Sequence, residues 1–106
     1  MAAEVVLPVN GDLRAWDAAI RAARWTVFVD AETRIRDVQL VQRRFALKRR
    51  DAGTDRVLLV LADTRFHRYL IQSLGTSLVD GALPARDYLA ALAAGRDPGG
   101  PGLILL

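Results

Sequence analysis

The chain has 106 residues, 52% of them hydrophobic, and a formal net charge of +3. This length predicts one domain spanning residues 1–106, large enough to bury about two-thirds of its unfolded surface. The lack of cysteine excludes disulfides and thiolate metal sites and fits a cytoplasmic protein. No apolar run approaches the roughly 20 residues of a membrane span, and MAAEVVLPV has no basic start, so we expect no membrane contact and no signal peptide.

The first 21 residues predict a short strand, a turn and one ambiguous segment. Residues 4–9 read as a strand at a sheet edge, because Pro8 has no amide hydrogen to donate. Asn10 and Gly11 follow as a turn. Residues 12–21 then fit two structures: their alanines and the spacing of Leu13 and Ile20 favour a helix, whereas the preceding turn favours a strand meander. The local pattern leaves both open.

Two apolar runs joined by a long charged segment form the centre of the chain. Residues 25–30 and 57–62 are rich in Val, Leu and Phe, and residues 31–52 have helical period. This order predicts two buried parallel strands with a crossover helix. Acids follow both strands, Asp30 and Asp63, and sites gather at the carboxyl ends of strands in open α/β sheets.

The predicted helix at 31–52 has two apolar faces of unequal size. Val38, Val41 and Phe45 form one stripe that should face the sheet. Leu40 and Leu47 form a smaller pair, available to another helix or to a partner chain. Gly53 is expected to cap the helix.

The same helix holds most of the positive charge of the chain. Seven basic residues stand against three acids between positions 31 and 52. Arg36, Arg43 and Arg50 recur every seven residues, which predicts an arginine stripe that contacts nucleic-acid phosphates. The alternative is a solvated face.

The remainder predicts two more helices and two strands. The helices span about 64–74, ended by Gly75, and 84–94, with Tyr88, Leu89 and Leu92 inward; the strands are 78–79 and the terminal LILL. We expect Trp16 and Trp25 in the core and His67 at a surface or half-buried position.

The series GDLRAWDAAI, VFVDAETRIRDVQLVQRRFALKRRDAG and DRVLLVLADTR resembles the domain behind the helix-turn-helix of some actinobacterial Xre/Cro-type regulators. It also resembles, more distantly, the restriction-endonuclease-like fold with its PD-(D/E)xK motif. The resemblance covers residues 4–65. It implies an antiparallel meander, a helix and another strand, and so favours a strand for the ambiguous segment.

The resemblance also implies a metal site. Asp17 would match the lone Asp of the motif and Asp30 its second carboxylate, with Glu32 as a third acid; in such nucleases carboxylates hold Mg²⁺. The position of the motif lysine falls on Glu32, and Lys48 lies more than four helical turns further along the sequence. We therefore expect weak Mg²⁺ binding at most, no other cofactor and no cleavage. The alternative for these acids is a structural or capping role.

These observations predict an α/β domain with a mixed central sheet flanked by helices, restriction-endonuclease-like. The expected function is non-catalytic: a regulatory, dimerisation or sensing module of a helix-turn-helix regulator that contacts nucleic acid through its basic helix. We expect a homodimer through Leu40, Leu47 and the terminal LILL. A Mg²⁺-dependent nuclease and a plain protein-interaction module are the alternatives.

Overall fold

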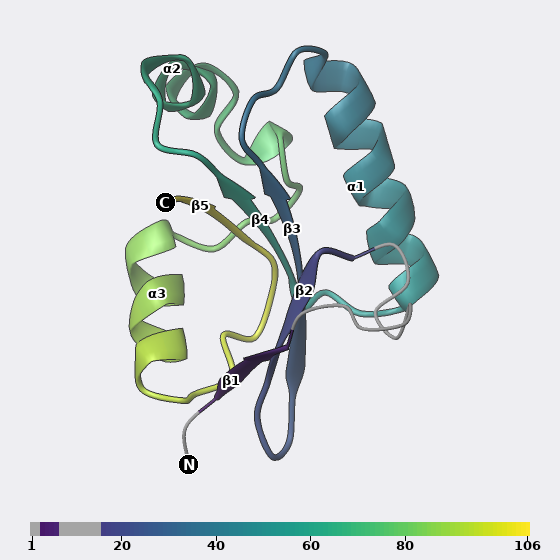
Figure 1. Cartoon of the computed structure of the whole chain (residues 1–106), viewed down its shortest axis with the longest axis vertical. Coiled ribbons are helices and arrows are strands. Elements are labelled where there is room, and N and C mark those ends of the chain that lie inside the picture. Colours follow the sequence, from purple (N-terminus) through teal and green to yellow (C-terminus); the bar gives the residue numbers. More distant parts are fainter. Residues whose placement is uncertain (1–2, 7–15) are drawn as a thin grey trace.

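A five-stranded mixed sheet forms the centre of the computed structural model, which describes residues 3–6 and 16–106 (Figure 1). Its strands lie side by side in chain order: β1 (Glu4–Val6), β2 (Ala18–Arg21), β3 (Thr26–Glu32), β4 (Val57–Leu61) and β5 (Gly102–Leu105). The first three pair antiparallel, and β4 and β5 continue the sheet parallel to β3. The predicted α/β class with a mixed sheet is confirmed.

The ambiguous segment is a strand where the structure describes it. Ala18 pairs with Val29 and Ile20 with Val27, so β2 lies between β1 and β3. Both edges of β2 are hydrogen-bonded to neighbours, and such tertiary pairing outweighs the weak helix preference of its alanines. Residues 7–9 of the first predicted strand and residues 12–15 lie outside the described residues.

The parallel pair with a crossover helix is confirmed, but the helix begins later than predicted. The strand β3 continues through Glu32, which pairs with Leu61, and α1 spans Val38–Ala52. Its true start is a local cap: an Asp37 side-chain oxygen accepts a hydrogen bond from the Leu40 amide at 3.0 Å. The prediction of a start at residue 31 is wrong because sheet pairing extends the strand. Gly53, at φ 66°, ends the helix as predicted.

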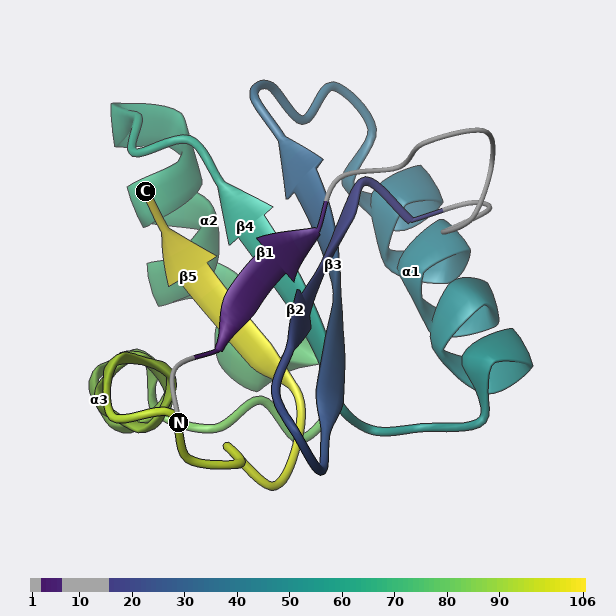
Figure 2. The same cartoon turned by 60° about the horizontal axis from the view of Figure 1, so that its bottom comes forward.

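Helices cover both faces of the sheet (Figures 1 and 2). On one face α1 and α2 (Arg65–Leu74) pack over a core that includes Trp16, Phe45 and Leu70; on the other, α3 (Ala85–Ala93) packs through Tyr88. The predicted α1 stripe does face the sheet. No helix in the described part of the chain has the length and apolar character needed to cross a membrane.

Two predictions after residue 74 are wrong, and the prediction of a last strand is confirmed. Leu78 and Val79 are buried but form no strand; they lie in a bend after a short 3₁₀ helix, η1 (Gly75–Ser77). Leu89 points outward from α3 and is 42% exposed. The LILL segment does form the last strand, β5, whose Leu103 and Ile104 are buried.

Candidate functional site

The predicted metal ligands lie on the α1 side of the sheet, near the end of β3. Strand alternation puts Asp30 and Glu32 on the same face as Phe28, which stacks on Trp16 in the α1-side core. Asp17 directly precedes β2, and its amide donates to the Val29 carbonyl at 3.0 Å. Continuing the register of this antiparallel pair places Asp17 beside Asp30.

Lys48 of α1 reaches this group of carboxylates. Its Nζ lies 2.7 Å from Asp30 Oδ2, and the two side chains are 19% and 7% exposed. The same ammonium lies 5.6 Å from the centre of the Trp16 ring. The two residues are 18 positions apart, so the sequence did not predict this contact. It forms because the crossover connection places α1 over β3.

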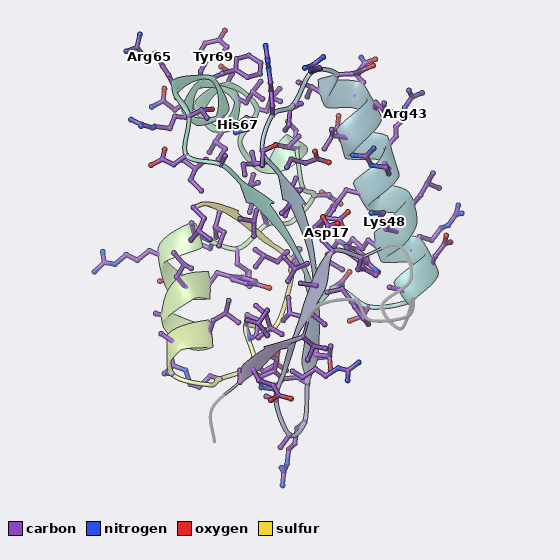
Figure 3. The ribbon with its side chains drawn as sticks, viewed as in Figure 1. Asp17, Arg43, Lys48, Arg65, His67 and Tyr69 are labelled. Carbon is purple, nitrogen blue, oxygen red and sulfur yellow. The ribbon has the colours of Figure 1, made fainter. Side chains whose placement is uncertain are left out.

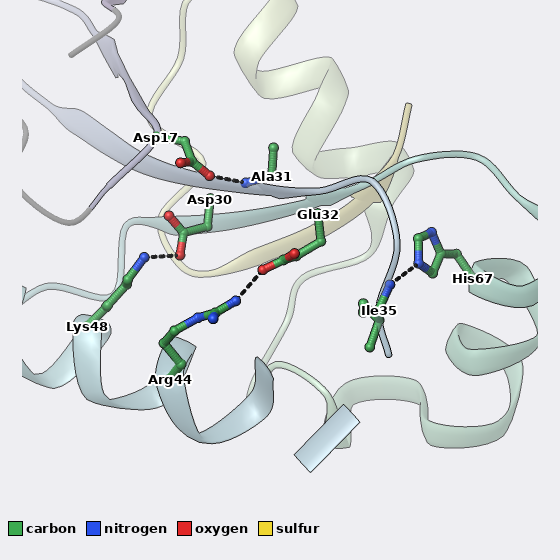
Figure 4. Close-up of polar contacts among 8 residues, drawn as sticks. All are labelled: Asp17, Asp30, Ala31, Glu32, Ile35, Arg44, Lys48 and His67. Atoms are coloured by element: carbon green, nitrogen blue, oxygen red, sulfur yellow. Dashed lines mark hydrogen bonds and ion pairs between the residues drawn. The ribbon is translucent and has the colours of Figure 1, made fainter. Parts of the chain in front are cut away.

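The other two acids are also held by protein donors (Figure 4). Asp17 Oδ2 accepts a hydrogen bond from the Ala31 amide at 2.9 Å. Glu32 forms an ion pair with Arg44 of α1. Of these three acids, Asp30 alone has an oxygen, Oδ1, that is buried and has no hydrogen-bond partner among the described residues. Within residues 3–6 and 16–106 there is no group of three or more His, Cys, Asp or Glu side chains that could hold a metal ion.

The predicted arginine stripe is shorter than expected. Arg36 lies in the loop before α1, so its seven-residue spacing from Arg43 does not place the two side chains on one face of a helix. Arg43 and Arg50 are both exposed on α1, and Figure 3 shows Arg43 on the outer side of the helix. Arg50 is 3.5 Å from Asp51, whereas Arg43 has no ion-pair partner among the described residues. Leu40 and Leu47, 48% and 49% exposed, alternate with the arginines.

Sequence reasoning missed the role of His67, which is 1% exposed rather than at the surface. Its Nδ1 lies 2.7 Å from the Ala62 carbonyl oxygen, and the Ile35 amide donates to its Nε2 at 3.2 Å. These two bonds require a neutral ring with the proton on Nδ1. His67 therefore ties the loop after β3 to the end of β4. Its partner Ile35 lies 32 positions away, so no local pattern could have revealed the contact.

A hollow of about 570 Å³ opens beside His67, at the carboxyl ends of β3 and β4. Its lining comes from the loop after β3 and the start of α2: Thr33, Arg34, Ile35, Arg36, Thr64, Phe66 and His67. Thr64 caps α2 by accepting a hydrogen bond from the His67 amide at 3.1 Å. Two arginines and an aromatic ring thus meet at the edge where α/β sheets commonly bind ligands.

The clearest pKa shifts belong to Asp97 and Tyr88, which lie away from both the carboxylate group and the hollow and have a structural role. Side-chain hydrogen bonds from Arg56 hold the pKa of Asp97 below its usual range, with a further bond from the Gly99 amide. Burial raises the pKa of Tyr88, whose hydroxyl has no hydrogen-bond partner within residues 3–6 and 16–106. The Arg56–Asp97 ion pair joins the start of β4 to the loop before β5.

Comparison of the chain with protein-family models, curated proteins and solved structures finds no match. The geometry of its own residues is therefore the basis for the functional proposals below.

Proposed function

We propose that this domain is a non-catalytic module of a helix-turn-helix transcription regulator and that it contacts nucleic acid through α1. The observation that carries the nucleic-acid contact is the outer face of α1, where Arg43 and Arg50 are exposed. Arginine offers a planar fork of donors that matches phosphate oxygens. The link to a regulator of the Xre/Cro type rests on the sequence resemblance.

The state of the carboxylates supports a non-catalytic role. Lys48 and Arg44 already neutralise Asp30 and Glu32, and Asp17 is held by a backbone amide. A metal ion held by all three acids would compete with the two cationic side chains for these carboxylates. In this arrangement the acids fasten α1 and the start of β2 to β3.

Salt dependence of duplex binding tests the proposal. If Arg43 contacts a phosphate, Arg43→Ala should weaken binding to all sequences alike and reduce the log–log salt slope by about 0.9. Arg86→Ala is a matched control, because Arg86 is exposed on α3 across the sheet. Absence of duplex binding even at low salt would reject the proposal.

The same face of α1 supports an alternative role in self-association. Leu40 and Leu47 are half exposed between the arginines, whereas Leu103 and Ile104 of the terminal LILL are buried in the core. A dimer would therefore use α1, in competition with phosphate contact. Sedimentation at tens of micromolar tests this role: a dimer lost in Leu47→Glu supports it, and a wild-type monomer rejects it.

A metal-dependent nuclease is the second candidate, favoured by the contact of Lys48 with Asp30. Asp17 and Asp30 would hold the metal, with the buried Oδ1 of Asp30 available to it. A bound Mg²⁺ supplies the charge that activates water and stabilises a phosphate. Lys48 stands where a lysine could stabilise developing negative charge.

Plasmid nicking separates this candidate from the first. Metal-dependent nicking that Asp30→Asn and Lys48→Met both abolish would establish the nuclease and reject the non-catalytic role. Nicking that persists in Asp30→Asn would identify a contaminating activity.

A further inference from the structure

We infer that the hollow at the carboxyl ends of β3 and β4 binds a nucleoside phosphate, with the base on Phe66 and the phosphate on Arg34 and Arg36. The nucleoside phosphate is either a free nucleotide or an unpaired nucleotide of a single strand. This site goes beyond the proposed function because it uses no residue of α1.

The two arginines are the anion-binding part of the site. Arg34 and Arg36 are exposed, line the hollow, and have no ion-pair partner in the part of the chain that the structure describes. Between them Ile35 is 3% exposed and donates its amide hydrogen to His67. The loop is therefore anchored at its middle residue, which reduces the ordering cost when flanking side chains bind a ligand.

Phe66 supplies the surface for a base. It lies in the first turn of α2, lines the hollow, and is 49% exposed, whereas Leu70 on the same helix is buried. Its ring lies 6.1 Å from the ring of His67, at a tilt of 44°. An exposed aromatic face beside arginines is the arrangement that stacks unpaired bases.

The size and chemistry of the hollow select among ligands. About 570 Å³ is within the range of small-molecule pockets. Inorganic phosphate would leave Phe66 unused, and an apolar ligand would leave Arg34 and Arg36 unpaired. Bases within a duplex stack on one another and cannot lie flat on Phe66.

Tyr69 distinguishes the two sources of the ligand. It is 62% exposed on α2, three positions after Phe66, and lies outside the residues that line the hollow. Residues three apart on a helix are neighbours. A second base of a single strand could therefore stack on Tyr69, whereas a free nucleotide would not reach it.

Calorimetric titration of the full chain with adenosine monophosphate and with a single-stranded oligothymidylate of six nucleotides tests the inference. Adenosine and inorganic phosphate serve as the matched half-ligands and should bind at least tenfold more weakly. Phe66→Ala and the double variant Arg34→Ala/Arg36→Ala should each weaken binding at least tenfold. All these side chains are exposed, so an unchanged urea midpoint confirms folding. Arg86→Ala, at an exposed position of α3, is the control and should bind the mononucleotide like the wild type.

The affinities of Tyr69→Ala for the two probes distinguish a single strand from a free nucleotide as the ligand. Loss of oligonucleotide affinity in Tyr69→Ala with unchanged mononucleotide affinity supports the site with a single strand as its source; unchanged affinity for both supports it with a free nucleotide. No binding of either probe at millimolar concentration overturns the inference, as does binding that survives the Phe66 and arginine variants. Duplex binding that depends on Arg43 is a separate result, so failure here leaves the proposed function intact.

Discussion

Lys48 Nζ lies 2.7 Å from Asp30 Oδ2, although 18 positions separate the two residues. The contact joins the middle of α1 to the end of β3. The carboxylate of Asp30 is 7% exposed, and its second oxygen is buried with no hydrogen-bond partner in the described part of the chain. The free-energy cost of burying a charge in such surroundings depends strongly on the opposite charge beside it.

Lys48→Met should therefore destabilise the domain more than Asp30→Asn. Removing the lysine leaves a buried carboxylate unpaired, at a cost of about 3 kcal/mol. Removing the acid leaves a lysine that is 19% exposed and can reach water, so about 1–2 kcal/mol is expected. Urea unfolding measures both, with Arg43→Met as the exposed control on the same helix. An equal or larger loss in Asp30→Asn would contradict this account.

Replacing His67 by leucine should release the loop that precedes α1. The substitution leaves the Ile35 amide and the Ala62 carbonyl without their partner and should cost about 3 kcal/mol. Hydrogen exchange at the Ile35 amide should speed up by more than exchange in α3. Gln72→Ala, exposed on the same helix, is the control. Unchanged exchange at Ile35 would show that the hydrogen bond does not hold the loop.

The Arg56–Asp97 pair should make stability depend on acid pH. Because the folded pKa of Asp97 is lowered, its contribution is present above the ordinary carboxyl pKa of about 3.9 and is lost as pH falls through the lowered value. Asp97→Ala should cost less than about 1 kcal/mol at pH 7, since the pair is partly exposed. The stability of this variant should approach that of the wild type as the pH falls through the lowered pKa of Asp97. Arg56→Ala should behave alike; a pH-independent difference would disprove the linkage.

Tyr88→Phe should stabilise the protein. The residue is 1% exposed, and its hydroxyl is buried with no hydrogen-bond partner among the residues that the structure describes. Removing that oxygen should therefore stabilise the fold by about 1 kcal/mol. Thermal or urea unfolding measures the gain. Tyr69→Phe, at an exposed position of α2, should have no effect. A loss of stability in Tyr88→Phe would indicate that the hydroxyl has a partner in solution.

Gly102→Ala should destabilise the α3 side of the core. A Cβ at Gly102 would lie 2.7 Å from the ring of Tyr88, which is closely packed and cannot move away. Overpacking of this kind costs about 1–3 kcal/mol. The double variant Gly102→Ala/Tyr88→Leu should recover part of that cost because it removes the clashing ring carbons. Additive losses in the double variant would count against a steric cause.

Local patterns in the sequence were enough to predict the β3–α1–β4 unit and the strand character of β5. Apolar runs, the Val38/Val41/Phe45 period and the cap at Gly53 depend on residues within a few positions of one another. Such signals survive without knowledge of the rest of the fold.

Only the tertiary structure decided where α1 begins, what His67 does and which residues surround Asp30. Ala31 and Glu32 are strand because β4 lies beside them. Arg36 lines the hollow because β3 continues to Glu32 and α1 begins only at Val38, which leaves Arg36 in the loop between them. The contacts of His67 and Lys48 join residues 32 and 18 positions apart. Periodicity describes one segment at a time, whereas these contacts arise from the way the sheet brings distant segments together.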